Sequence, residues 1–265
     1  MHILICEDSV EGILTGIYRA CEWHLEPEDT RIQIGEAGNL QLFAEYHTVE
    51  PNAETAGKVI RSIRAKLGDE VAYDLHNAMA SADEEKGDAV YHTVVMAYAG
   101  KGRSVMNCLQ NDYVRKVSEL SRNVWCETHH LYGFLRFEEL ASGVLYASIS
   151  PKNHILAMLA PHFADRFPLE NFVIHDVKRQ LYVVHPRKQD WYMIHATEEQ
   201  NPDAGQQGKN MQLSEREDFI QSLFRHFVST ISIEDRKNTD LQRNLLPLRF
   251  RPFMAEFRTT KNENG

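Results

Sequence analysis

"ETHHLYGFLRFEELASGVLYASISP", residues 127–151, marks the point where the hydrophobic pattern of the chain changes its period. Before Gly133, apolar residues recur every three or four positions, as on one face of a helix, and the glycine is placed to end that helix. After it, residues 134–140 and 143–150 alternate apolar and polar side chains, as strands do, and a short glycine-containing link joins them. The stretch therefore predicts a helix followed by a β-hairpin.

The segments that follow extend this sheet. A helical pattern begins near Pro151 and ends at Phe167, which precedes a proline. Three strand-like runs come next, "NFVIHDV", "QLYVVHP" and "DWYMIHA", and their short links favour antiparallel neighbours. We expect about five antiparallel strands between residues 134 and 196 with one inserted helix. An amphipathic helix from Ser214 and an irregular, basic, aromatic arm complete the chain.

Patterns upstream of this stretch are mostly helical. "HILIC" at residues 2–6 predicts a short buried strand, and Ser9 and Asn52 are placed to cap helices. Prolines and glycines interrupt residues 26–50, which show no long element. The fold class predicted is α+β, as one domain over residues 1–257, helix-rich over 1–132 and sheet-rich over 133–257. Residues 258–265 are expected to be a disordered tail.

Composition narrows the classes of function. Hydrophobic residues make up 43% and charged residues 25% of the 265, an ordinary globular composition. No apolar run approaches the ~20 residues that span a bilayer, and the acidic beginning differs from a signal peptide. The four cysteines form no C-x-x-C pair, and the common nucleotide-binding, zinc-protease and hydrolase motifs are absent. We therefore expect a cytoplasmic protein with no metal, cofactor or membrane partner.

Charge is distributed unevenly along the chain. Residues 1–100 hold 7 basic and 18 acidic residues, a net charge of −11. Residues 236–261 hold 7 basic residues against 2 acidic ones. A positive surface in the C-terminal half is possible despite the overall charge of −9, although such a run is often only a solvated face.

Four residues are weak candidates for acid–base catalysis: Glu127, His129, His175 and Asp176. Adjacent histidines on a helix point about 100° apart, so His129 and His130 are poor partners for one metal ion. Near a helix C-terminus a cationic imidazole is favoured by the dipole. In His175–Asp176 a carboxylate beside an imidazole can tune a general base, but Asp also favours a hairpin turn.

Arginines of the C-terminal half are candidates for nucleic-acid contact. Arginine binds phosphate while aromatic rings, here Phe250, Phe253 and Phe257, stack on bases. The competing interpretation is internal, with the arginines pairing to acidic residues of the N-terminal half. The candidates are Arg136, Arg236, Arg243, Arg249 and Arg251.

Several segments resemble a bacterial family of unknown function whose members are labelled DNA metabolism proteins. The segments are "HHLYGFLRFEEL", "APHFADRFP", "FVIHD" and "ISIEDRKNTDLQRNLLPLRF", and "CEDSVEGILTGIYRACE" is similar to the family's opening. The resemblance implies a gene neighbour that is a radical-SAM protein of DNA modification or repair, and some members are fused to a uracil-DNA-glycosylase-like domain. The chain departs from the pattern at His130, where the family often has Arg, and at residues 246–250, which are more apolar.

Three functions remain open on this basis. The first is an accessory protein of DNA metabolism or repair that acts with the radical-SAM partner and contacts nucleic acid. The second is an enzyme that acts on a modified or damaged base through the acid–base candidates. The third is a docking module without nucleic-acid binding. The first is our expectation from the sequence.

Overall fold

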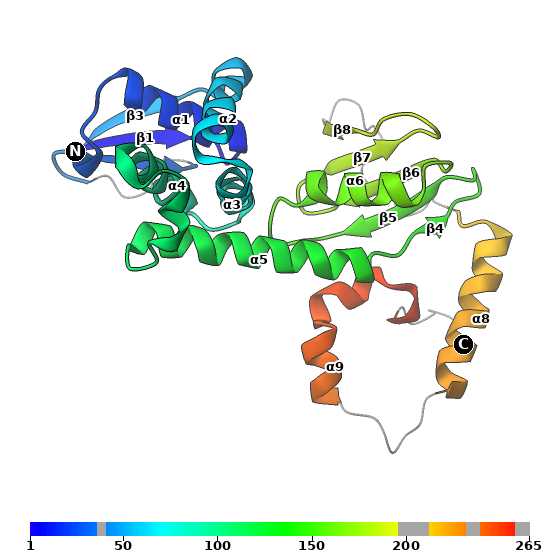
Figure 1. Cartoon of the computed structure of the whole chain (residues 1–265). Helices are drawn as coiled ribbons and strands as arrows, with labels where there is room; N and C mark the ends of the chain where they lie inside the picture. Colours follow the sequence, from blue (N-terminus) through cyan, green and yellow to red (C-terminus); the bar gives the residue numbers. More distant parts are fainter. Residues whose placement is uncertain (36–40, 196–211, 232–238, 258–265) are drawn as a thin grey trace. The chain divides into compact units, whose positions relative to one another are not determined.

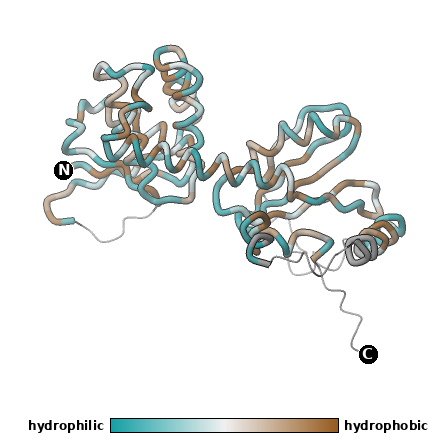
Figure 2. The backbone as a smooth tube through the Cα atoms, turned by 60° about the horizontal axis from the view of Figure 1, so that its bottom comes forward, coloured by the Kyte–Doolittle hydropathy of each residue, from teal (hydrophilic) through white to brown (hydrophobic). Residues whose placement is uncertain are grey.

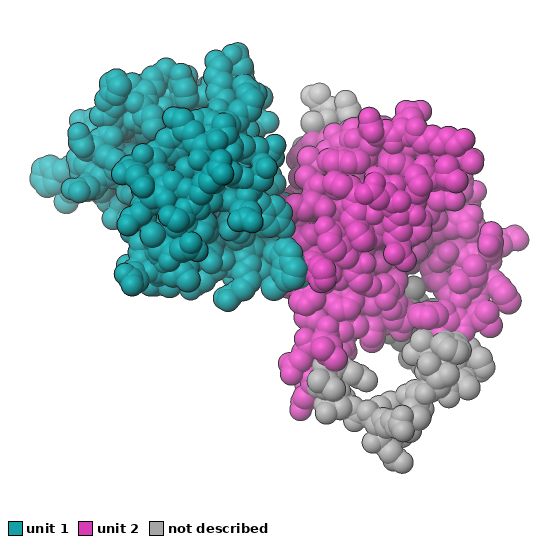
Figure 3. Space-filling model, in the orientation of Figure 1, with its two compact units in different colours: residues 1–127, 152–154 teal, residues 128–151, 155–265 magenta. Residues whose placement is uncertain are grey.

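The computed structural model describes residues 1–35, 41–195, 212–231 and 239–257 (Figure 1). Its contacts divide the chain into two compact units, coloured separately in Figure 3. Unit 1 comprises Met1–Glu127 and the tripeptide Lys152–His154, and unit 2 comprises Thr128–Pro151 and Ile155–Gly265. Each unit has a β-sheet of its own.

The sheet of unit 1 has three parallel strands: β1 (His2–Cys6), β2 (Thr30–Ile34) and β3 (Glu45–Val49). Their order is β2-β1-β3, so the predicted "HILIC" strand is confirmed and lies in the centre. The expectation of a helical first half holds only in part, because β2 and β3 fall in the segment that showed no long element. Both are short and partly polar, which hides them from a search for apolar periodicity.

The described residues of the first part of the chain also form five α-helices, of which the first and the fourth pack against this sheet, and Figure 2 shows hydrophobic and hydrophilic residues alternating along them. The predicted caps are confirmed: Ser9 Oγ accepts from the Gly12 amide at 2.9 Å and Asn52 Oδ1 from that of Thr55 at 2.9 Å. The helices are α1 (Val10–Glu22), α2 (Ala53–Leu67), α3 (Asp69–Ala80), α4 (Lys86–Met96) and α5 (Asp112–Phe134), with short turns at Pro27–Asp29, Ala97–Lys101 and Gly102–Asn107.

Helix α1 lies unusually close to β1. A Cβ built on Gly12 would come within 2.6 Å of the Glu7 carbonyl oxygen, and one on Gly16 within 2.4 Å of Cys6 Sγ. Only glycine fits at either position without a shift of the neighbouring chain. The turn between β1 and α1 is therefore held tightly at the carboxyl edge of the sheet.

The sheet of unit 2 has five strands in the order β4-β5-β6-β7-β8. The strand number agrees with the prediction, but an all-antiparallel sheet is wrong, because β5 and β6 pair in parallel. Helix α6 lies in their connection, long enough to return the chain to the same end of the sheet. The other three pairings are antiparallel. The elements are β4 (Glu138–Glu139), β5 (Leu145–Ile149), α6 (Leu156–Arg166), β6 (Phe172–Asp176), β7 (Leu181–His185) and β8 (Tyr192–His195).

The helix-to-strand boundary differs from the prediction. Helix α5 passes through Gly133 to Phe134, and the first hairpin strand shrinks to the two residues of β4. Arg136 accounts for the later end, since its Nη1 donates to the carbonyls of Gly133 at 2.8 Å and Leu135 at 3.3 Å. These bonds satisfy carbonyls that the end of a helix leaves unpaired.

The C-terminal segments complete unit 2 with α8 (Glu215–Ile231), α9 (Thr239–Leu245), and the short turns Leu248–Phe253 and Ala255–Phe257. The predicted cap of α8 is confirmed, because Ser214 Oγ accepts from the Glu217 amide at 3.1 Å. Within the described ranges, the helices lack the combination of length and apolar composition that crosses a bilayer.

Candidate functional site

The carboxyl edge of the parallel sheet in unit 1 is the first place to look for a ligand site. The chain leaves the central strand β1 toward β2 and then crosses to β3 on the other side. In open α/β sheets, ligands bind outside the carboxyl ends of the strands at such a switch point. A cavity of about 580 Å³ lies at this edge, and Glu7, Asp8, Gly35 and Glu50, which follow the three strands, help to line it.

Asp8 is the most strongly perturbed acid of this edge. It lies in the turn between β1 and α1, its side chain is 49% exposed, and Lys86 Nζ donates to its Oδ1. His154 Nε2 lies 3.6 Å from its other oxygen, Oδ2, which is ion-pair range. His154 and then Lys86 hold the pKa of Asp8 far below its ordinary value, against the opposing effect of partial burial. Asp8 is therefore a carboxylate at neutral pH.

Lys86 is the buried partner of this group. Its side chain is only 1% exposed, and Nζ also donates to the Ser81 carbonyl at 2.5 Å. Burial of an ammonium is costly unless it is paired and hydrogen-bonded, and here Asp8 and the carbonyl supply both. Lys86 begins α4 after a sharp turn, so the turn between α3 and α4 is tied to the turn between β1 and α1.

A second network positions the tripeptide that carries His154. Glu127 is buried, and its carboxylate accepts from the amides of Lys152 at 3.0 Å and Asn153 at 2.9 Å and from Asn153 Nδ2 at 2.8 Å. Asn153 Oδ1 in turn accepts from the Ala82 amide at 3.0 Å. The predicted acid–base candidate Glu127 thus has its carboxylate engaged by three donors, and it acts here as a positioning residue.

His175 of unit 2 lies on β6, where its side chain contacts two tyrosines. Its Nδ1 is 2.7 Å from the Tyr146 hydroxyl, and its ring stacks on Tyr182 with centroids 4.1 Å apart. Burial lowers its pKa, although a hydrogen bond with Gln180 and the charge of Asp176 oppose the shift. Burial also raises the pKa of Tyr146 to about 12. The pair is therefore neutral at pH 7.

Asp176 has the geometry of a turn residue. Its side chain is fully buried, and it accepts from the Lys178 amide at 3.1 Å and from Arg179 Nη1 at 2.9 Å. These contacts close the hairpin between β6 and β7, the second of the two roles that the sequence left open. His129, on α5, is exposed, and its ring meets Tyr132 edge to face at 5.9 Å.

The arginine candidates do not form one equivalent set. Arg136 pairs with Glu256 at 3.1 Å, in addition to its bonds at the end of α5. Arg243 is exposed and lies 3.7 Å from Asp240. These ion pairs join residues of unit 2, whereas the internal alternative expected partners in the N-terminal half. Arg236 lies outside the described residues.

Arg249 and Arg251 share a different arrangement. The guanidinium of exposed Arg249 lies 4.7 Å from the centre of the Phe250 ring, and that of Arg251 lies 5.0 Å from the Phe257 ring. Arg251 Nη2 also contacts the Leu246 carbonyl at 3.4 Å. Stacked guanidinium groups of this kind are held in place and can still receive a phosphate.

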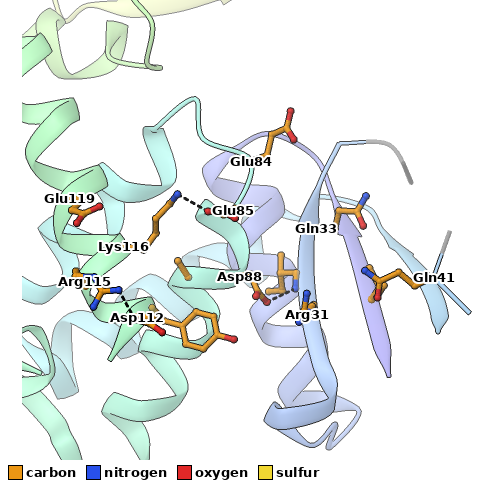
Figure 4. Close-up of a pocket in the computed structure, with 14 residues that line it drawn as sticks. Arg31, Gln33, Gln41, Glu84, Glu85, Asp88, Asp112, Arg115, Lys116 and Glu119 are labelled. Atoms are coloured by element: carbon orange, nitrogen blue, oxygen red, sulfur yellow. Dashed lines mark hydrogen bonds and ion pairs between the residues drawn. The ribbon is translucent and has the colours of Figure 1, made fainter. Parts of the chain in front are cut away.

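A second cavity in unit 1, of about 440 Å³, lies beside β2 and helices α4 and α5 (Figure 4). Several charged groups on its wall pair with each other. Arg115 bonds Asp112 at 2.5 Å, and Lys116 bonds Glu85 at 2.6 Å and Asp83 at 3.0 Å. Figure 4 shows that the Arg115–Asp112 and Lys116–Glu85 pairs join residues of the wall itself, which is the behaviour of an ordinary charged surface.

Sequence reasoning missed Asp8, Lys86 and His154 because they are far apart in the chain. The sequence did carry one usable signal, since Asp8 stands between a predicted strand and the Ser9 cap of a predicted helix. That is the position from which a side chain reaches the carboxyl edge of a parallel sheet. The sequence pattern predicts only β1 of the three strands, so it does not indicate a parallel sheet in this part of the chain.

Comparison with known families identifies a match that covers more than half of the chain. Residues 84–256 match the model of DUF4130, a domain of unknown function. The match includes Lys86, Glu127 and His154 and leaves Asp8 outside its range. No curated protein has a sequence that matches the chain.

Proposed function

The chain belongs to the DUF4130 family, and because that description carries no function, we propose from its site that it is an enzyme of DNA metabolism. Its substrate would be a modified or damaged base, or a nucleotide, bound at the carboxyl edge of the parallel sheet in unit 1. The observation that carries the proposal is the ionised Asp8, held by Lys86 and His154 beside a cavity at the switch point. The resemblance to DNA metabolism proteins supports the biological setting and a radical-SAM partner.

The chemistry assigned to this group is proton transfer. His154 is 35% exposed, so its imidazole can exchange a proton with a ligand, and the Asp8 carboxylate 3.6 Å away can orient the ring. Lys86 keeps Asp8 ionised and takes no direct part. The exposed oxygen surface of Asp8 can also accept a hydrogen bond from a ribose hydroxyl or a base amino group.

Binding of small probes tests this proposal. Deoxynucleoside monophosphates, including deoxyuridine monophosphate, are titrated into the full-length protein by calorimetry. For the nucleotide that binds the parent protein, we expect Asp8→Asn and His154→Gln each to lower the affinity by at least about 10-fold. A hydrogen bond to a charged group contributes about 1.5–3 kcal/mol. Asp112→Asn, at an exposed carboxylate of the other cavity, is the matched control. Failure of the whole panel to bind, or equal affinity in all variants, would overturn the proposal.

Nucleic-acid contact through the C-terminal arm is the second candidate. It is favoured by two exposed arginines, Arg243 and Arg249, the second stacked on an aromatic ring. It is the accessory function expected from the sequence, without Arg136, whose closer ion pair is to the largely buried Glu256, and without Arg236, which lies outside the described residues.

A salt titration separates this candidate from the enzyme and from a docking module. Each phosphate contact on duplex DNA contributes a slope of about 0.9 to the dependence of log affinity on log salt. Arg243→Ala with Arg249→Ala should therefore reduce the slope by about 1.8, and Arg115→Ala, an exposed arginine of unit 1, should leave it unchanged. An unchanged slope in the double variant would show that the C-terminal arm does not contact the nucleic acid. A chain that binds its protein partner but no DNA or RNA is a docking module.

A further inference from the structure

Three side chains suited to binding a transition metal meet at the amino edge of the sheet in unit 1. They are His2 on β1 and Glu45 and His47 on β3. The strand register pairs His2 with Glu45 and Leu4 with His47, so all three side chains project from one face of the sheet. This edge is opposite the one that carries Asp8, because the strands are parallel.

The ligand atoms are spaced as a tetrahedral ion requires. His2 Nδ1 lies 3.4 Å from His47 Nε2 and 3.4 Å from Glu45 Oε2, and the two latter atoms are 4.0 Å apart. Bonds of about 2.0–2.1 Å at tetrahedral angles place ligand atoms about 3.4 Å apart. Two of the three separations already match, and the third needs only a small movement of Glu45, whose side chain is 73% exposed.

The two imidazoles are partly open to solvent. The side chains of His2 and His47 are 29% and 34% exposed, so each ring is held by its strand without being enclosed. The ring of Trp23 lies 5.3 Å from that of His47 and limits its rotation. The competing explanation is a plain hydrogen bond between the two imidazoles, with Glu45 as a nearby acceptor.

We propose that His2, Glu45 and His47 bind one divalent transition-metal ion of the zinc type, with solvent in the remaining position. Two imidazoles and one carboxylate are a ligand set that Zn²⁺ accepts, and an open fourth position is the arrangement of reactive rather than structural zinc. The expectation of no metal depended on the spacing of ligands along the sequence. That spacing cannot reveal a set of ligands from two strands, since His2 and Glu45 are 43 residues apart in the chain. This inference is independent of the function proposed for the Asp8 edge.

Calorimetric titration of ZnSO₄ into the metal-free, full-length protein tests the site, with no tag because a polyhistidine tag binds zinc itself. We expect one ion per chain. Loss of a group that only orients a ligand costs about 10–100-fold in metal affinity, so His2→Ala and His47→Ala should each cost at least 10-fold. Mg²⁺ and Ca²⁺ should not compete, since they prefer sets of oxygen ligands.

The control and a second measurement keep the outcome unambiguous. His24→Asn removes a neighbouring exposed histidine outside the set, keeps a residue type that tolerates the positive φ of 52° there, and should bind zinc as the parent does. Zinc should raise the unfolding temperature of the parent and of His24→Asn but not of the alanine variants. Absence of stoichiometric binding, or equal affinity in parent and alanine variants, would show that the rings only share a hydrogen bond.

Discussion

Removal of one charge at a time from the Asp8–Lys86 pair should produce unequal losses of stability. Asp8→Asn leaves the ammonium of Lys86 buried at 1% exposure without a counter-ion, with only the neutral Ser81 carbonyl and the new amide oxygen as acceptors. Breaking a buried pair in this way costs about 3–5 kcal/mol, and the retained carbonyl places the expected loss near 3 kcal/mol. Lys86→Met leaves a carboxylate that is 49% exposed and stays solvated, so we expect a loss of about 1 kcal/mol.

The difference can be measured by urea unfolding of a chain in which Trp23, in unit 1, is the only tryptophan. With a urea dependence of about 2 kcal/mol per molar, a difference of ~2 kcal/mol separates the midpoints of the two variants by about 1 M. Lys116→Met is the matched control, because Lys116 is 28% exposed and its pairs with Asp83 and Glu85 are at the surface. Its expected cost is below about 1 kcal/mol.

The order of the stability losses among the variants tests the burial argument. If Lys86→Met is more damaging than Asp8→Asn, the lysine contributes by packing and the carboxylate is dispensable. If Asp8→Asn costs no more than Lys116→Met, the ammonium is reached by water and the burial argument fails. The double variant should be less damaging than the sum of the single ones, since neither unpaired charge remains.

Three further outcomes are expected. Because the folded-state pKa of Asp8 is lowered, its contribution is present above the unfolded value near 3.9 and is lost on acidification, so the stability gap between parent and Asp8→Asn should narrow in urea titrations below about pH 4. Gly12→Ala should lose about 1–3 kcal/mol through its clash in the β1–α1 turn, whereas Gly57→Ala, near only the flexible Arg61, should gain up to about 1 kcal/mol in thermal unfolding. Glu127→Gln should lose about 1–3 kcal/mol and speed amide exchange at residues 152–153, and unchanged exchange would contradict the positioning role.

The local parts of the fold could be predicted from the sequence. Caps at Ser9, Asn52 and Ser214 depend on residues within four positions, and each is present. The antiparallel strands after residue 171 were also recognised, because short links leave few alternatives. Local periodicity and link length are sufficient for such elements.

Features that depend on long-range pairing were not accessible. The parallel pairing of β5 and β6 depends on where the chain returns after α6, and strand periodicity carries no information about that. The strand expected over residues 134–140 shrinks to the two residues of β4, since the side chain of Arg136 hydrogen-bonds the carbonyls of Gly133 and Leu135 at the helix end instead of extending the sheet. In both cases the deciding contact joins parts that the local pattern treats separately.

The burial pattern within the Asp8 group argues for more than a structural role. A pair that only holds two turns together gains little from charge, since apolar side chains of similar size often serve equally well. Here the cost of burial falls on Lys86 alone, while the carboxylate that it stabilises is left half exposed at the edge of a cavity. A buried cation beneath an accessible anion favours ionisation of that anion and fixes its position, which a ligand site requires and a structural tie does not. The Glu127 network brings a second partner, the partly exposed imidazole of His154, to the same carboxylate.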